Sequence, residues 1–228
     1  MLHGYAPALL QGALVTLGVA LGSLAIAALL GLLGAAAKLS RSRVARGVAT
    51  LYTTLVRAVP DLVTMLLVFY GGQMLINQLG ERLGWDYIDI NPFVAGVATI
   101  GFIFGAYLTE VLRGAVLAVP AGQREAAVAY GLTPTQTWRR VIIPQMLRHA
   151  LPGLSNNWLV MLKSTSIVSV IGLADLMNRA GQAAGITREP FLFYGAVALV
   201  YLAFTSLSEA GFAWLQTRFS VGVRKATF

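Results

Sequence analysis

The segment Gly4–Ala37 reads GYAPALLQGALVTLGVALGSLAIAALLGLLGAAA and carries no charged side chain. A helix needs about 20 apolar residues to cross the roughly 30 Å of bilayer hydrocarbon, so this segment is longer than one crossing requires. We place the span at Val15–Ala36 and expect Tyr5–Gln11 to form a short segment on the outer side. The segment therefore predicts a protein embedded in a membrane.

The composition of the whole chain also indicates a membrane protein. Of the 228 residues, 57% are hydrophobic and 11% are charged, whereas charged residues make up about 25% of an average soluble domain. So few charges do not cover a water-soluble surface, which excludes an ordinary soluble enzyme and a disordered chain. Cysteine is absent and the two histidines are far apart in the sequence, so we expect no disulfide, no metal site and no catalytic residue.

Four further apolar segments are long enough to act as spans. The chain is therefore predicted to be an all-α integral membrane protein with about five transmembrane helices in a single domain, residues 1–228. Five spans place the two termini on opposite sides of the membrane. The four segments are Leu62–Leu79, Pro92–Thr109, Leu151–Leu173, which is interrupted by Lys163, and Pro190–Trp214.

The distribution of lysine and arginine predicts the orientation of these spans. Five basic residues follow the first span, five follow the third and three lie in the C-terminal tail, against three on the opposite side. Basic residues concentrate on the cytoplasmic side, so the N-terminus faces out and the C-terminus faces in. The net charge of +8 then reflects topology and does not indicate a nucleic-acid partner. Residues 1–14 lack the basic residues of a signal peptide, so we expect the first helix to be retained.

The cytoplasmic segment Glu110–His149 is long for a connection, and long loops are usually functional or carry structure of their own. Gln123–Tyr130 has good helix formers, and Gly131 is expected to end that helix. Thr133 and Pro134 are typical of an N-cap and a first helical position. The second short helix is expected to run to about Val141 and to end before Pro144. This helix–glycine–helix element would expose Ala126 and Ala127 beside Glu125, either for a partner protein or as an interfacial hairpin without a partner.

The same residues resemble a known family. Glu125-Ala126-Ala127, Gly131 four residues later, and Pro144 are similar to the EAA loop of ABC-importer permease subunits. In that family the loop supplies the helix that docks into the ATP-hydrolysing subunit. The resemblance implies the type I ABC-importer permease fold, a cytoplasmic coupling loop at about 118–146, and ATPase coupling by Gln123, Glu125, Ala126, Ala127, Gly131 and Pro144.

The resemblance extends over nearly the whole chain. Arg57-Ala58-Val59-Pro60-Asp61-Leu62 with Phe69-Tyr70-Gly71 is similar to the second-helix signature of polar amino-acid permeases. Within that family, Leu10–Leu17, Glu189-Pro190-Phe191 and Ser220-Val221-Gly222-Val223 are most similar to the Q-type subunits of histidine/lysine-arginine-ornithine permeases.

The resemblance also implies partners and a place in the cell. It implies a multi-pass subunit of the bacterial inner membrane that forms half of the path for polar, basic amino acids: histidine, arginine, lysine or ornithine. The implied partners are a related but different permease chain, two ATP-binding subunits, a periplasmic or extracellular solute-binding protein, the amino-acid substrate and membrane lipid, without nucleic acid. This chain has no G-x-x-x-x-G-K-[ST] loop, so no cofactor is expected on it, and ATP and Mg would bind to the partner ATPase.

Polar residues inside the fourth span are candidates for a translocation path, because polar groups within a membrane need protein partners or a wet cavity. Helix–helix hydrogen bonds explain them one at a time, whereas a translocation path explains many of them together, and we favour the path for the helix as a whole. Lys163 is either a functional charge that meets a substrate carboxylate or a structurally paired or snorkelling lysine. Glu110 and Arg113, three residues apart, are predicted to form an ion pair. The path or gate candidates are Arg57, Pro60, Asp61, Tyr70, Asn156, Asn157, Lys163, Ser164, Thr165 and Ser166, and Asp61 is predicted either to pair with Arg57 or to contribute to a gate.

Alternative functions remain open from the sequence. A secondary transporter or channel not driven by ATP would need a coupling-ion site, and acidic residues are few in the spans. A membrane enzyme would need a convergent catalytic cluster, and a membrane scaffold would not need the EAA loop. Stimulation of a partner ATPase distinguishes the permease interpretation from all three.

Overall fold

The computed structural model describes residues 2–219, and every regular element in that range is a helix. The tail motif Ser220–Val223 lies outside the described residues, as do the basic residues Arg224 and Lys225. The α-helices are α1 (Ala6–Leu39), α2 (Arg43–Ala58), α3 (Asp61–Leu66), α4 (Gly72–Leu83), α5 (Pro92–Leu117), α6 (Ala121–Ala129), α7 (Pro134–Thr137), α8 (Ile143–Ser164), α9 (Leu176–Thr187) and α10 (Pro190–Phe219).

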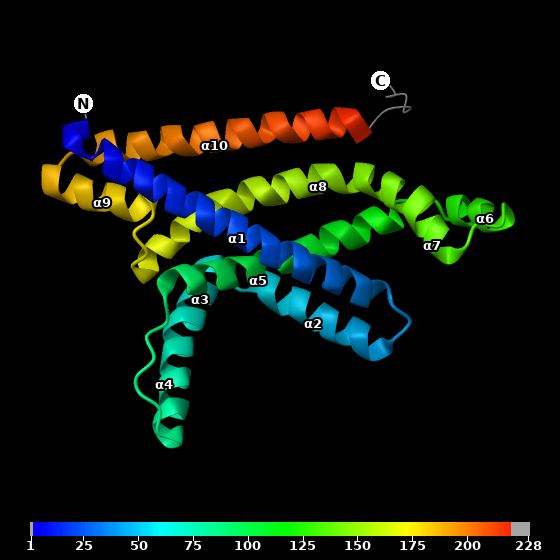
Figure 1. Cartoon of the computed structure of the whole chain (residues 1–228), viewed down its shortest axis with the longest axis horizontal. Helices are drawn as coiled ribbons and strands as arrows, with labels where there is room; N and C mark the ends of the chain where they lie inside the picture. Colours follow the sequence, from blue (N-terminus) through cyan, green and yellow to red (C-terminus); the bar gives the residue numbers. More distant parts are fainter. Residues whose placement is uncertain (1, 220–228) are drawn as a thin grey trace.

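The prediction of about five membrane spans is confirmed. Four helical runs are long and apolar enough to cross a membrane, and a bent pair, Pro134–Ile171 with Leu176–Thr187, makes a fifth. In Figure 1, α1, α5, α8 and α10 run along one common direction. The N-terminal residues and α9 lie at one end of this bundle, and α6, α7 and the last turn of α10 lie at the other. The positive-inside orientation makes the α6–α7 end cytoplasmic.

Small residues bring α1 and α5 into close contact at the centre of the bundle. A Cβ atom added to Gly101 of α5 would lie 2.6 Å from the Ile26 Cβ atom of α1, and one added to Gly31 of α1 would lie 2.6 Å from the Leu108 Cβ atom. Large apolar side chains such as Ile100 and Ile103 fill the adjacent core. Small residues at helix contacts are the usual means of tight packing in membranes, where apolar surface alone does not drive association.

The first helix is longer than expected, and the prediction of a separate outer segment Tyr5–Gln11 is wrong. The helix begins at Ala6, with Tyr5 as its N-cap residue and a proline in its first turn, where proline is well tolerated. Leu9 and Ala13 are buried against Leu176 of α9 and Phe193 of α10. Packing at the outer end therefore keeps these turns helical.

The residues after the first span, which the sequence identifies only as a basic segment, form the helix α2. The side chain of Ser42 accepts a hydrogen bond from the Ala45 N–H at 3.2 Å and caps α2. This amphipathic helix runs back along α1 and α5 (Figure 1). Its arginines were interpreted as a topology signal, which concealed its helical pattern.

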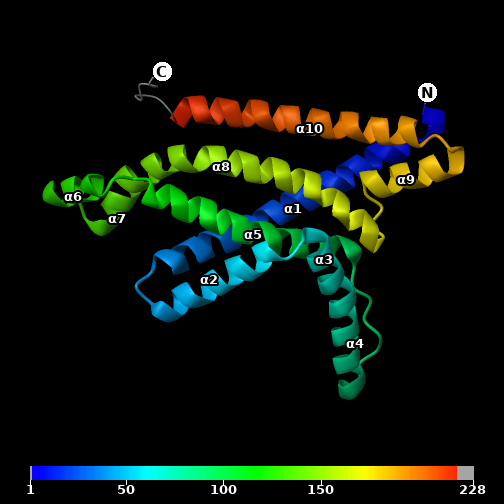
Figure 2. The ribbon, with the colours of Figure 1, turned by 180° about the vertical axis from the view of Figure 1, so that it is seen from behind.

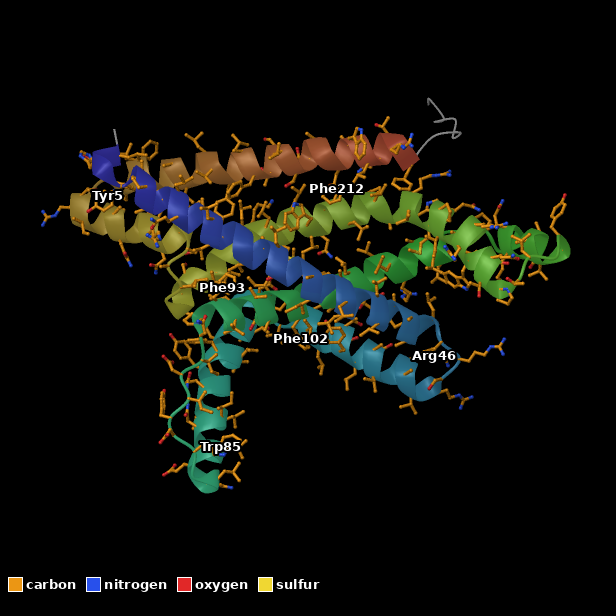
Figure 3. The ribbon with its side chains drawn as sticks, viewed as in Figure 1. Tyr5, Arg46, Trp85, Phe93, Phe102 and Phe212 are labelled. Atoms are coloured by element: carbon orange, nitrogen blue, oxygen red, sulfur yellow. The ribbon has the colours of Figure 1, made fainter. Side chains whose placement is uncertain are left out.

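The second predicted span is part of a helical run, Asp61–Leu83, that contains a π-helical turn at Leu67–Gly71. Only 6% of the residues in its apolar 18-residue stretch are buried, whereas 61% are buried in the corresponding stretch of α5. In Figures 1 and 2, α4 projects steeply away from the bundle, and Figure 3 shows Trp85 at its tip, whereas Arg46 lies at the α1–α2 end of the molecule. Asn77 of α4 binds both the N–H and the carbonyl of Ile88, which holds the returning segment against the helix.

The fourth span differs most from its prediction. The second cytoplasmic helix does not end before Pro144: a π-helical turn at Trp138–Ile142 joins α7 to α8, and Pro144 lies in the first turn of α8. Proline has no N–H and is tolerated at such a position. At the outer end a 3-10 helix, Thr165–Ile171, leads to Gly172 with φ 83°, and the chain bends by 55° into α9, a helix that the sequence pattern does not predict.

Candidate functional site: a cytoplasmic helix and an exposed polar helix face

A short cytoplasmic helix, α6, connects the ends of two long helices. It begins four residues after the end of α5, and its Gln123 Oε1 accepts a hydrogen bond from Gln145 Nε2 of α8 at 3.1 Å. Gly131 ends the element in the left-handed region at φ 76°, and the Leu132 N–H bonds back to the Ala127 carbonyl at 3.0 Å. This is the Schellman arrangement that glycine makes possible. The prediction that Gly131 ends the helix is confirmed.

The exposed surface of α6 is only partly the predicted one. Gln123, Glu125 and Ala126 are exposed, whereas Ala127 is buried. The expectation that Ala127 is exposed is therefore wrong for the chain as described, because α6 packs on the π-helical turn behind it. Thr133 and Gln136 form the capping box that begins α7, as Thr133-Pro134 predicted.

An apolar hollow of about 490 Å³ lies next to α6. The last turn of α5 supplies Val116 and Leu117, and the π-helical turn supplies Trp138 and Ile142. The cytoplasmic end thus combines an exposed short helix with an adjacent recess, a surface suited to receiving another protein.

The polar residues of α8 do not share one face. Asn156 and Lys163 are exposed, whereas Asn157 is buried and lines a cavity of about 270 Å³ with Leu24 and Ala28 of α1. Successive residues of a helix point about 100° apart, which separates the two asparagines. The exposed Asn156 and Lys163 mark the open side of α8, and in the view from behind α8 lies in front of α1 (Figure 2).

Most hydroxyl groups after Lys163 donate hydrogen bonds to backbone carbonyls of the preceding turn. Ser166 donates to the Lys163 carbonyl at 2.9 Å, and Thr165, which is buried, donates to the Leu162 carbonyl at 2.7 Å. Ser164 is half-buried. Among residues 2–219, the Lys163 ammonium group has no hydrogen-bond or ion-pair partner. Asn156 and Lys163 are thus the predicted path residues that the structure leaves accessible together.

The residues predicted at the mouth of the second span lie around the α2–α3 junction. Arg57 packs its guanidinium 5.2 Å from the ring centroid of Tyr107 on α5. No ion pair between Arg57 and Asp61 occurs in the described part of the chain, so that predicted pair is not formed. Pro60 and Tyr70 are exposed, and Asp61 is half-buried in the first turn of α3.

The predicted ion pair on α5 is confirmed and is part of a larger cluster. Arg113 Nε lies 2.9 Å from Glu110 Oε2, and Lys38 of α1 binds the other oxygen of Glu110. Lys38 also donates to Thr53 Oγ1 at 2.7 Å. The sequence does not single out Lys38 and Thr53, because a lysine that follows an apolar segment has the same pattern as a basic residue at the cytoplasmic end of any span. Among the described residues, no three His, Asp or Glu side chains converge to hold a metal.

The chain matches the family described as "Binding-protein-dependent transport system inner membrane component" over residues 27–221. It is 52% identical, over 99% of both chains, to the histidine/lysine/arginine/ornithine transport system permease protein HisQ of Salmonella typhimurium. It is 40% identical to the arginine ABC transporter permease protein ArtQ of Haemophilus influenzae, over 96% of this chain and 97% of that protein. A solved amino acid ABC transporter with histidines superposes with a TM-score of 0.80 at 34% identity, covering 94% of this chain and 95% of the other.

Proposed function

Since the chain belongs to the family of inner-membrane components of binding-protein-dependent transport systems, we propose that it forms half of a translocation path for basic amino acids. It is a permease subunit of an ABC importer in the bacterial inner membrane and has the type I permease fold. It has no ATPase site of its own, and ATP hydrolysis takes place on a separate subunit.

The substrate class rests on full-length similarity to relatives whose names specify basic amino acids. HisQ is named for histidine, lysine, arginine and ornithine, and ArtQ for arginine. We therefore expect one or more of these four substrates. Asn156 and Lys163, on the open side of α8, would meet the backbone end of the substrate, since an ammonium group attracts a carboxylate and repels a cationic side chain. Arg57, Pro60, Asp61 and Tyr70 would form the adjacent gate.

The coupling role rests on one observation above all: α6 is short, exposed and attached to both α5 and α8 at the cytoplasmic end. A partner ATPase that binds ATP and Mg would contact Gln123, Glu125 and Ala126. Gly131 and Pro144 would keep α6 and the start of α8 in place, and Ala127 would support α6 from behind. ATP-driven closure would then displace α6 and move the long helices as rigid bodies, which switches access between the two sides.

The family and the solved relative support a transporter made of several chains. Beyond that, we propose a second, related but different permease chain beside this one, two ATP-binding subunits below and a solute-binding protein on the outer side. The steep projection of α4, with its largely unburied apolar surface, leaves room for a neighbouring chain.

Uptake into proteoliposomes tests this function. The vesicles would contain this chain, its candidate permease partner and the ATPase, with the binding protein on the outer side. We expect ATP-dependent uptake of radiolabelled arginine or histidine that excess lysine or ornithine reduces and excess leucine does not. Uptake that proceeds without ATP along an ion gradient would instead identify a secondary transporter.

A further inference from the structure

Polar side chains from three helices meet near the cytoplasmic end of the bundle. Lys38, in the last turn of α1, donates to Thr53 Oγ1 of α2 at 2.7 Å and to Glu110 of α5. The second oxygen of Glu110 accepts from Arg113 Nε at 2.9 Å. Lys38 is therefore a residue of α1 that contacts both α2 and α5, in addition to the close packing of α1 on α5. We call these four residues the Lys38 cluster.

Lys38 is shielded from solvent together with Glu110, which sets it apart from the other basic residues at this end, including Arg113, whose side chain is 38% exposed. The side chains of Lys38 and Glu110 are 10% and 21% exposed. Shielded charges interact more strongly than exposed ones, whose pairs contribute little. Arg41, three residues after Lys38, is exposed and makes no hydrogen bond or ion pair among residues 2–219.

The position of the cluster places it between α6 and the body of the protein. Glu110 lies two helical turns, about 10 Å, before the end of α5. The next hydrogen bond between α2 and α5, from the Tyr52 hydroxyl to the Phe102 carbonyl at 2.6 Å, lies further from α6. A displacement of α6 is therefore transmitted from α5 to α1 and α2 through the Lys38 cluster as well as through the packing of α1 on α5.

We propose that Lys38 is a positioning residue that makes α1, α2 and the cytoplasmic half of α5 move as one body when α6 is displaced. This inference rests on the proposed function, since it assigns the cluster to the same coupling step. Without Lys38, α5 follows the ATPase while α1 and α2 lag behind it. ATP is then hydrolysed with less transport for each turnover.

Replacing Lys38 by methionine is the cleanest way to break the connection. Glu110 keeps Arg113 as its partner, so no uncompensated charge is left in the cluster. The Thr53 hydroxyl keeps its hydrogen bond to the Thr50 carbonyl at 3.2 Å. Methionine also keeps the length and apolar character of the lysine stem.

The test measures amino acid transported per ATP hydrolysed in proteoliposomes with the full complex. We expect Lys38→Met to keep ATPase activity near wild type and to lower the ratio about fivefold or more, the usual scale of coupling energies. Lys38→Arg keeps the charge and should restore most of the ratio. Arg41→Met removes an exposed charge from the same end and should leave the ratio unchanged.

A wild-type ratio in the assembled Lys38→Met transporter would overturn the inference, as would an equal fall in the Arg41→Met control. If Lys38→Met prevents assembly, Thr53→Val tests the same connection, because it removes only the hydroxyl that links α2. A ratio below wild type would then support the inference, and a wild-type ratio would overturn it. Failure of the proposed function itself has a different signature, since the wild-type complex would show no ATP-driven uptake.

Discussion

At the residue scale, the contact between α1 and α5 depends on positions that have no side chain. A Cβ atom on Gly105 would lie 2.7 Å from the Leu30 Cβ atom and 2.8 Å from the Tyr52 hydroxyl oxygen. We expect Gly105→Ala to destabilise the protein by about 1–3 kcal/mol through overpacking. Thermal unfolding of the detergent-solubilised chain measures this effect.

Gly114 provides the matched control in the same helix. Nothing lies within 4 Å of a Cβ atom at this position, so Gly114→Ala should be neutral or stabilise by up to about 1 kcal/mol through helix propensity. Equal unfolding temperatures for the two variants would contradict the packing described for α1 and α5.

Individual residue roles were predictable where sequence spacing fixes the geometry. The Glu110–Arg113 pair and the Thr133 cap follow from spacings within one helix, and both are present. Lys38 joins a residue 72 positions away, which no local pattern reveals. Likewise, both Asn156 and Asn157 looked like path residues, and only the packing of α1, α5 and α10 around α8 separates them.

At the element scale, the N-terminus of α9 is held by a residue from α1. The Leu176 N–H donates to Thr16 Oγ1 at 3.2 Å, and both residues are fully buried. We expect Thr16→Val, which keeps the shape and removes the acceptor, to cost about 1–3 kcal/mol because a buried N–H loses its partner. Amide hydrogen exchange at Leu176 should become faster.

A second threonine, Thr217, serves as a control for the general effect of replacing threonine by valine. Thr217 is exposed on α10 and its hydroxyl bonds only to the Ala213 carbonyl of its own helix. Thr217→Val should leave stability and the exchange at Leu176 unchanged. Unaltered exchange in Thr16→Val as well would show that the Thr16 hydroxyl does not hold the N-terminus of α9.

The orientation of the elements can be tested with single cysteines, because the natural sequence has none. Tyr87, in the α4–α5 connection, and Arg41, in the α1–α2 turn, are both exposed. With the N-terminus outside, Tyr87→Cys should react with a membrane-impermeant maleimide in spheroplasts, and Arg41→Cys only after the membrane is permeabilised. The reverse labelling pattern would invert the topology.

The existence of the elements was more predictable than their limits. Apolar length and composition are sufficient to find five spans. However, α1, α5 and α10 all continue beyond the predicted bounds, because the residues that flank the apolar stretches are helical too. The helices α2 and α9 were missed because neither is long and apolar enough to look like a span. Their stability comes from packing on α1, α5 and α10.

At the scale of the whole molecule, the structure connects the cytoplasmic surface with the outer end through long helices. The helix α5 is unbroken from the outer side to the turn before α6, and the run Pro134–Ile171 returns from α7 to the bend before α9. Figure 1 shows α6 and α9 at opposite ends of this arrangement. A rigid connection of this kind transmits a displacement at α6 through the whole bundle.

The most direct test of coupling through α6 is ATP hydrolysis by the reconstituted complex, with and without substrate-loaded binding protein. The test variant is Glu125→Lys in the exposed surface of α6, and the control is Glu81→Lys, which reverses an exposed charge near the tip of α4. We predict that substrate-loaded binding protein stimulates the wild type and the control but not Glu125→Lys, although all three complexes insert into the membrane. Normal stimulation in Glu125→Lys, or the absence of any ATPase bound to the wild type, would contradict coupling through α6.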